Sequence, residues 1–262
     1  MPTDRSFTTS HTGPTVLDLT QNTGRISISV NPLAKNTTVL VTTEADTGTS
    51  ADAVTDARFT ESGSRLTVNI PTPGGGGGNV VIGGNSVNMS GDSIFVGGGG
   101  GRIVVNGVDV TDVVNGGATG TRVTEVVTSI IIPVDSEVLL STQTATVAVR
   151  GELKALDYGG TSGRLDAEVV GELSLSLTSG DARIKNVTRR LEAVLTSGDL
   201  AVDRYSGSDG RLTLTSGDAT VHATPQSSGR FHIGLTSGDA RLTGAGHLDV
   251  RKRVTSGRVR VS

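Results

Sequence analysis

Four aspartates recur at one position of a short repeat and are the side chains of this sequence best placed to do chemistry together. Each follows the tripeptide T-S-G, as in "LTSGDARI" at 177–184, and the four are Asp181, Asp199, Asp218 and Asp239. If the repeats stack in register, the carboxylates form a row whose like charges repel, which favours binding of a cation or a basic ligand. The alternative is a set of solvated turn aspartates that accept local backbone hydrogen bonds. Arg164 and Arg258 take the place of the aspartate in the two flanking repeats.

A second charged group closes the sequence. The segment "VRKRVTSGRVRVS" contains no acid and carries five basic residues, which are Arg251, Lys252, Arg253, Arg258 and Arg260. One interpretation is a patch for an anionic partner or a membrane surface. The other, which we favour, is that charge on a terminal strand discourages end-to-end pairing of strand edges.

No set of residues stands out as catalytic or metal-binding. The chain has no cysteine, and its histidines lack the H-x₃-H or H-E-x-x-H spacing of zinc sites: they are His11, His222, His232 and His247. Two pentaglycine runs lack the G-K-[ST] of a phosphate-binding loop. A sugar-cleaving site needs converging carboxylates, usually with aromatic platforms, and aromatic residues make up only 2% of the chain. We therefore expect no catalytic residue, no metal, no cofactor and no enzymatic activity.

The repeat that carries the aspartates must be built from short strands. Its first threonines recur at steps of 17, 18, 19, 21 and 19 residues: Thr161, Thr178, Thr196, Thr215, Thr236 and Thr255. Apolar residues alternate before the T-S-G, as in Leu173, Leu175 and Leu177, and again after it, as in Leu200 and Val202. Period two predicts strands with one buried face, and a period of about 20 residues predicts stacked repeats. The sequence predicts an all-β protein, a parallel β-solenoid of about seven or more coils of 17–21 residues, with right-handed connections favoured.

The T-S-G tripeptide is interpreted as the corner between the two strands of a coil. Its glycine is expected to supply a positive φ that a side chain would oppose. The six corner glycines are Gly163, Gly180, Gly198, Gly217, Gly238 and Gly257. A worn seventh copy, "VLLSTQTATV" at 138–147, aligns with the first full repeat at a step of 20 residues.

The sequence divides into four regions. Residues 1–13 are expected to be disordered, 14–70 to form strands that open the solenoid, 71–120 to be a glycine-rich insertion with one or two hairpins, and 121–262 to be the T-S-G-D repeat. The insertion has a second interpretation, an arm that orders on a partner or closes one end of the solenoid.

Charge and hydropathy limit the partners and the location. The net charge of −3 and the scarcity of aromatic residues give no case for nucleic acid as the main partner. No stretch approaches the ~18 apolar residues of a transmembrane helix, and the first residues lack the apolar run of a signal peptide. A cytoplasmic location is the default expectation, and association with a surface stays open.

The T-S-G-D corners, together with "IIPVDSEVLLSTQTATVAVRG" ahead of them, resemble a bacterial family of β-strand-repeat proteins named "putative adhesin", a domain of unknown function. The resemblance implies a β-solenoid over 121–262 and supplies no catalytic residue. We expect a non-enzymatic module for binding or scaffolding whose partner is an unknown protein or surface ligand. One alternative is a self-assembling filament of the bactofilin kind, and a more remote one is a glycan-active β-helix enzyme.

Overall fold

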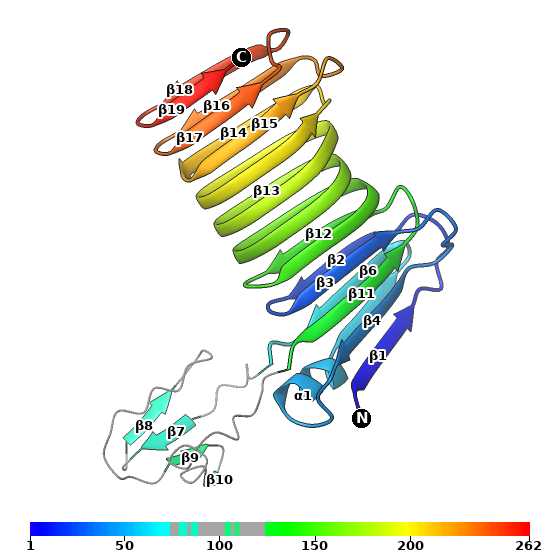
Figure 1. Ribbon diagram of the computed structural model, residues 1–262. Helices are drawn as coiled ribbons and strands as arrows, with labels where there is room; N and C mark the ends of the chain where they lie inside the picture. The colour runs from blue at the N-terminus through cyan, green and yellow to red at the C-terminus, as the bar shows by residue number, and fades with distance from the viewer. Residues whose placement is uncertain (74–78, 83–84, 89–102, 106–107, 110–123) are drawn as a thin grey trace.

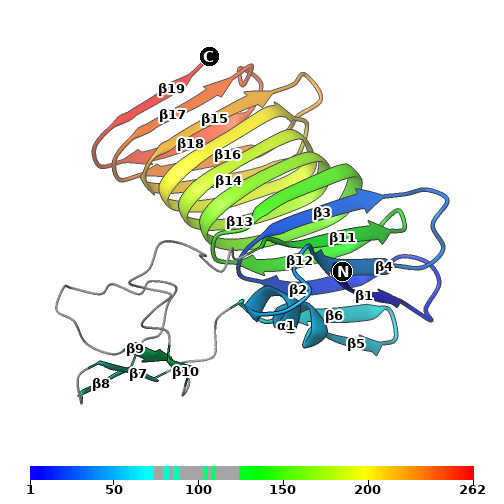
Figure 2. The ribbon, with the colours of Figure 1, turned by 60° about the horizontal axis from the view of Figure 1, so that its bottom comes forward.

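The protein is all-β, as the repeat predicted, and its strands wind into one elongated body (Figure 1). The structure is a computed structural model that describes residues 1–73, 79–82, 85–88, 103–105, 108–109 and 124–262. Residues 137–262 form a column of stacked windings that ends at the C-terminus. The strands nearest the N-terminus close the other end of the body (Figures 1 and 2).

The column contains the T-S-G-D repeats. Its strands are β12 (Glu137–Thr142), β13 (Thr146–Tyr205), β14 (Asp209–Ser216), β15 (Asp218–Ala223), β16 (Arg230–Leu235), β17 (Asp239–Thr243), β18 (Asp249–Val254) and β19 (Arg258–Val261). β13 is continuous over 60 residues and passes through several windings, so the strand continues through the T-S-G positions there.

Each winding contributes one strand segment to each of two faces. The first face contains β12, β14, β16 and β18, and the second contains β15, β17 and β19; segments of β13 belong to both. Neighbouring windings pair in parallel and in register, so that Leu214 lies beside Leu235 on the first face and Val221 beside Leu242 on the second. The repeat therefore sets the register, because a shift of one residue would turn every apolar side chain outward.

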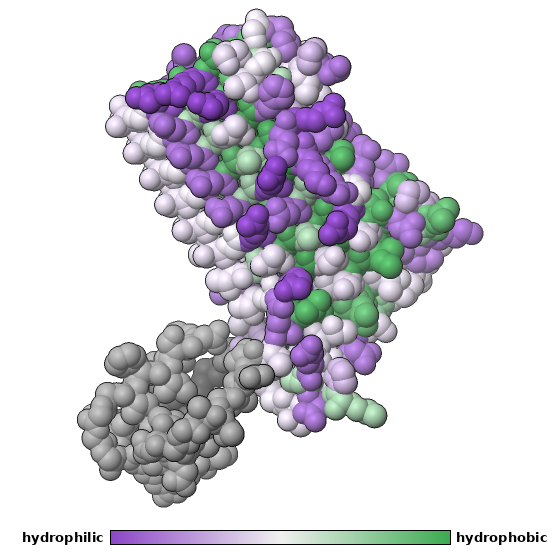
Figure 3. Space-filling model, in the orientation of Figure 1, coloured by the Kyte–Doolittle hydropathy of each residue, from purple (hydrophilic) through white to green (hydrophobic). Residues whose placement is uncertain are grey.

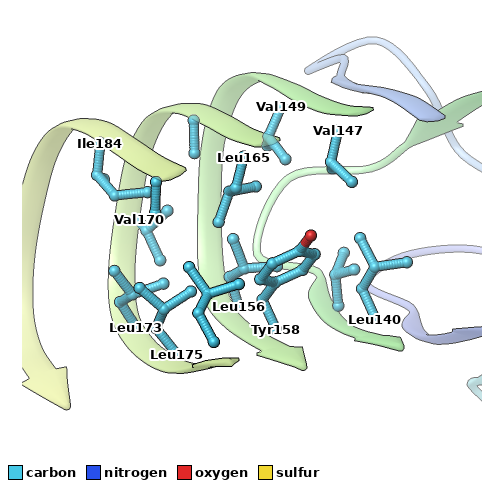
Figure 4. Packing of buried hydrophobic residues seen from close by; sticks show 14 of the residues in the cluster. Leu140, Val147, Val149, Leu156, Tyr158, Leu165, Val170, Leu173, Leu175 and Ile184 are labelled. Atoms are coloured by element: carbon cyan, nitrogen blue, oxygen red, sulfur yellow. The ribbon is translucent and has the colours of Figure 1, made fainter. Parts of the chain in front are cut away.

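The core lies between the two faces. Burial alternates along the strands as the period-two pattern predicted, for instance in β14 and β15. Leu156 and Leu173 point inward from one face toward Val149 and Leu165 on the other (Figure 4). Each fully buried leucine or valine contributes about 1.5–3 kcal/mol relative to an exposed one, so the apolar ladders are the main stabilising feature of the column.

The corner glycines are required by close stacking more than by their φ angles. Gly217, Gly238 and Gly257 have positive φ as predicted, but Gly163, Gly180 and Gly198 do not, which corrects the prediction for those three. A Cβ on Gly198 would lie 2.2 Å from the carbonyl oxygen of Gly180, and one on Gly180 would lie 2.5 Å from that of Gly163. The corners pack backbone on backbone, and no side chain fits between them.

The worn repeat joins the column at a different step from the predicted one. Ser141 pairs with Gly159, and the amide of Ser162 donates to the carbonyl of Gln143. The step is therefore 18 residues and not 20, because strand pairing, rather than the faint similarity of the corner, sets the alignment.

The N-terminal region is threaded out of chain order. Its elements are β1 (Thr3–Thr8), β2 (Val16–Gln21), β3 (Arg25–Val30), β4 (Thr38–Thr43), α1 (Thr49–Thr55), β5 (Arg58–Ser62), β6 (Arg65–Ile70) and β11 (Val126–Ile132). β2 lies between β6 and β12, and β3 lies between β11 and β13, all in parallel. The winding formed by β2 and β3, which comes first in the sequence, is thus enclosed by strands that come later in the sequence. The prediction that 14–70 form the opening coils of the solenoid did not include this order.

Antiparallel strands and one helix close this end of the body. Residues 1–13 were expected to be disordered, yet β1 pairs with β4 over Thr3–Thr8. β5 forms a hairpin with β6. The rings of Phe7 and Phe59 stack with centroids 5.4 Å apart, and the guanidinium of Arg5 lies 5.6 Å from the ring of Phe59. This local aromatic pair gave no periodic signal in the sequence.

Much of the predicted glycine-rich insertion, 71–120, lies outside the described residues. Within it, β7 (Asn79–Ile82), β8 (Asn85–Asn88), β9 (Ile103–Val105) and β10 (Val108–Asp109) form an antiparallel sheet of four strands.

Candidate functional site

The predicted aspartates form a row along one corner of the column. Asp199 lies one winding from Asp218, which pairs in register with Asp239, and all three side chains are exposed. The amide of Asp218 donates to Oδ1 of Asp199 (3.1 Å), and the amide of Asp239 donates to Oδ1 of Asp218 (2.9 Å). At least two of the four carboxylates therefore link consecutive windings. This structural role resembles the alternative considered from the sequence, in which the aspartates accept backbone hydrogen bonds at the turns.

The row ends in arginine on both sides. Arg258 pairs in register with Asp239. At the other end, the pKa of Arg164 is raised, first by its hydrogen bond to Asp166 (2.9 Å) and by the charge of that residue, with a further contribution from Asp181. An arginine therefore lies next to the row of acids at each end, which reduces the net negative field of the row.

A shallow hollow of about 310 Å³ runs beside the row on the second face. Its lining includes the small residues Ala201 and Thr220 as well as Arg183, which forms an ion pair with Asp203 (3.2 Å). A second hollow of about 160 Å³ continues past Thr220 toward the C-terminus, lined by Asp218, Ala219, Thr220, Asp239, Ala240, Arg241, Arg258 and Arg260. Acids and arginines border both hollows, so this surface suits an extended ligand with polar or charged groups of both signs.

The basic residues of the C-terminal segment occupy the last winding. All five are exposed: Arg251, Lys252, Arg253, Arg258 and Arg260. Arg258 and Arg260 lie beside the aspartate row on the second face, whereas Arg251 and Arg253 belong to β18 on the first face. The structure therefore brings only part of the basic group to the aspartate row.

Both tyrosines are buried in the core and offer no platform for a sugar. The hydroxyl of Tyr158 lies 3.0 Å from Oγ1 of Thr142, and burial raises the pKa of Tyr158, opposed by that hydrogen bond. Burial, assisted by the charge of Asp209, also raises the pKa of Tyr205, whose ring meets Phe231 edge to face.

The histidines lie apart from one another on the outside of the body. Nδ1 of His222 is 2.8 Å from Oγ1 of Thr243, and Nε2 of His247 is 2.9 Å from Oγ of Ser227. In the part of the chain that the structure describes, no group of three or more His, Cys, Asp or Glu side chains is arranged to hold a metal ion.

One hollow was not predicted from the sequence. It has a volume of about 580 Å³ and lies on the return side of the windings, lined by Pro14, Val134, Asp135, Glu152, Leu153, Lys154, Gly171, Thr188 and Arg189. Asp135 is the described non-glycine residue with a positive φ, 59°. These residues come from the irregular returns, which share no motif, so no spacing in the sequence could have grouped them.

The model of one protein family, Toastrack DUF4097, matches residues 17–262. The match spans the column, the N-terminal windings and the insertion between them. No curated protein matches the chain. The one described helix, α1, has seven residues, and no helix of the described ranges is long and apolar enough to cross a membrane.

Solved structures of similar fold come from bacteria. A "putative adhesin" from Bacteroides fragilis is 11% identical, with a TM-score of 0.55, and the alignment covers 100% of this chain and 97% of that one. A "putative cell adhesion protein" from Clostridium sporogenes is 12% identical, with a TM-score of 0.41 and coverage of 100% and 99%. At 11% identity, the likeness to the Bacteroides fragilis protein concerns the fold alone.

Proposed function

Because this chain belongs to the Toastrack DUF4097 family, we propose that it is a binding or scaffolding module, adhesin-like in architecture, and not an enzyme. In this proposal the column is a right-handed parallel β-solenoid of seven or more coils. Parallel registers at steps of 18 to 21 residues support the solenoid, and the strong preference for right-handed parallel connections supports its hand.

The observation that carries the proposal is the exposed aspartate row with the hollows beside it. The four aspartates recur once per winding, and strands in adjacent windings lie about 4.8 Å apart. A rigid row of this kind can meet a ligand at several evenly spaced points, and weak contacts then add along its length. The name of the Bacteroides fragilis neighbour suggests that such a ligand belongs to a cell surface.

A binding role also agrees with the shape of the surface. The hollows beside the row are shallow, and their carboxylates lie along a line rather than around a reacting centre. The two tyrosines that could have stacked on a sugar are 0% exposed. Catalysis needs groups that converge on one substrate atom.

The test measures binding of the fluorescently labelled full chain to intact Gram-positive and Gram-negative bacterial cells. A variant with Asp181, Asp199, Asp218 and Asp239 changed to Asn keeps a side-chain oxygen for the inter-winding hydrogen bonds and loses the charges. We expect it to bind about tenfold more weakly, a loss of about 1.4 kcal/mol.

The matched control changes four exposed aspartates outside the row, Asp4, Asp52, Asp157 and Asp209, to Asn. It has the same net charge and should bind like the natural chain. Equal weakening by both variants, or no binding by the natural chain to either cell type, would reject the row as the site. Release of reducing or unsaturated sugar ends from polygalacturonate would reject the non-enzymatic assignment.

A further inference from the structure

The last winding forms an exposed basic end. Arg251 and Arg230 share Asp249, at 3.5 and 3.3 Å, but Lys252, Arg253, Arg258 and Arg260 take part in no ion pair within the described part of the chain. Figure 3 shows strongly hydrophilic residues along the upper edge of the body, where β18 and β19 lie in Figure 1.

Lys252 occupies a core position of this winding. It pairs in register with the buried Ile233, while its own side chain is exposed. Its methylene stem can cover the apolar end of the column and keep the ammonium group in water. The winding is thus built to end the core at a charged surface.

The opposite end of the body is acidic. Residues 44–56 contain four acids and no basic residue, and all four acids are exposed: Glu44, Asp46, Asp52 and Asp56. We call them the acidic end. Asp46 meets the ammonium of Met1 at 3.6 Å, and the nearby Arg5 is engaged by the carbonyl of Thr55 and the ring of Phe59. Figures 1 and 2 show α1 and the last winding at opposite ends of the body.

Both ends also present strand edges. Among the described strands, β18 pairs only with β16 and β19 only with β17, while β1 pairs only with β4 and β5 only with β6. Two edges at one end of the body could therefore meet two edges at the other end of a neighbouring copy. Unpaired edges of this kind are templates for another strand.

We propose that the basic end binds the acidic end of a second copy of this chain, so that copies associate head to tail. Five basic residues face four acids in such a contact. Two basic ends would repel each other, and so would two acidic ends, so charge selects the head-to-tail arrangement over both symmetric ones. A head-to-tail contact does not close on itself and generates an open chain of subunits.

This inference goes beyond the proposed function and does not depend on it. It concerns the two ends of the body, whereas the proposed ligand site runs along its side and reaches the basic end at Arg258 and Arg260. The interpretation favoured from the sequence, that charge on the terminal strand discourages end-to-end pairing, is thereby limited to like ends, because unlike ends attract each other.

Sedimentation velocity of the full chain tests the contact. At about 20 mM NaCl, where charges are felt over roughly 20 Å, we expect a weight-average mass that exceeds the 26.6 kDa monomer and rises with concentration. At about 500 mM NaCl, where screening acts within roughly 4–5 Å, the mass should fall to that of the monomer.

Two charge-reversal variants sharpen the test. The tail variant carries Lys252→Glu and Arg253→Glu, and the head variant carries Glu44→Lys and Asp56→Lys, all at exposed positions. Each alone should stay monomeric at low salt, because the two reversals reduce the basic end from five positive charges to a net charge of +1, or the acidic end from four negative charges to a net charge of zero. An equimolar mixture should associate, since the unchanged acidic end of the tail variant can bind the unchanged basic end of the head variant. A control with Arg204→Glu and Arg211→Glu, at exposed positions away from both ends, should associate like the natural chain.

Several results would overturn the proposal. These are a natural chain that is monomeric at low salt, tail and head variants that still associate alone, and a mixture that stays monomeric although circular dichroism shows both variants folded. Binding of poly-glutamate by a natural chain that remains monomeric would assign the basic end to an acidic partner and would equally reject association of copies. None of these results bears on cell binding through the aspartate row.

Discussion

At the scale of single residues, the corner glycines show how far a repeated motif can be interpreted. The sequence identified them as corner positions, and the structure places them there. The sequence alone could not show why glycine is needed at each corner, because the φ angle and the distance to the next winding depend on how the windings stack. Gly238 has a φ of 105°, whereas Gly198 does not have a positive φ and is constrained by the backbone of Gly180.

Gly198→Val should destabilise the protein by about 2 kcal/mol or more, because its side chain would overlap the carbonyl of Gly180. Gly198→Ala should lose nearly as much, since the clash begins at Cβ. Thermal and urea unfolding followed by circular dichroism measure the change. Gly246→Ala is the control, because a Cβ at Gly246 meets nothing within 4 Å. An unchanged melting temperature for Gly198→Ala would refute the close-stacking account.

Glu61 predicts a dependence of stability on acid pH. Its carboxylate accepts from the amides of Ser10 (3.0 Å) and His11 (2.8 Å) and from the hydroxyl of Ser10. The backbone hydrogen bond from Ser10, followed by that from His11, lowers the pKa of Glu61 below its ordinary 4.5. A carboxyl with a lowered folded-state pKa stabilises fully above its unfolded pKa and loses that contribution as pH falls through the folded value.

The variant Glu61→Gln should therefore show a smaller loss of stability between pH 6 and pH 3 than the natural chain. Urea unfolding at the two pH values measures the difference, and Thr60→Ala on the same strand is the control. An equal loss in Glu61→Gln and the natural chain would show that this contact contributes nothing to the pH dependence.

At the scale of elements, alternating apolar residues predicted the strands of the column well. Leu191, Ala193 and Leu195 were expected inside on period two alone and are buried. The order of the N-terminal strands could not be predicted, because β2 and β3 carry the same alternation wherever they insert. α1 was missed because seven residues are too few for a helical period to stand out.

Two truncations should differ sharply because of this topology. Removing 244–262 deletes β18 and β19, which are paired on one side only, so the rest should fold with a lowered melting temperature. Removing 1–30 deletes β1 together with β2 and β3, each of which is paired on both sides, and leaves β6, β11, β12 and β13 each with one unpaired edge. We expect that product to be unfolded or aggregated, as measured by circular dichroism and gel filtration. A cooperative melt in the second truncation would contradict the inferred role of the enclosed winding.

At the scale of the whole molecule, the body has unlike ends, and only one of them could be recognised from the sequence. The basic end is continuous in the chain, from Arg251 to Arg260, and was visible as a charge cluster. The acidic end is also continuous, but nothing in the sequence placed residues 44–56 at the far end of the body. The aspartate row was predicted because a regular repeat turns sequence spacing into spatial spacing, whereas the return-side hollow has no such regularity behind it.

The enclosed winding of β2 and β3 has a mechanical consequence. A pull on the C-terminus meets β18 and β19 first, each held on one side, and can strip the column one winding at a time. The last repeat step is 19 residues, so each event would lengthen the chain by about 65 Å at full extension. A pull on the N-terminus frees β1 and then reaches β2, which must break two ladders at once. The molecule should therefore unfold gradually, one winding at a time, under tension applied to the C-terminus, and should need a larger force under tension applied to the N-terminus.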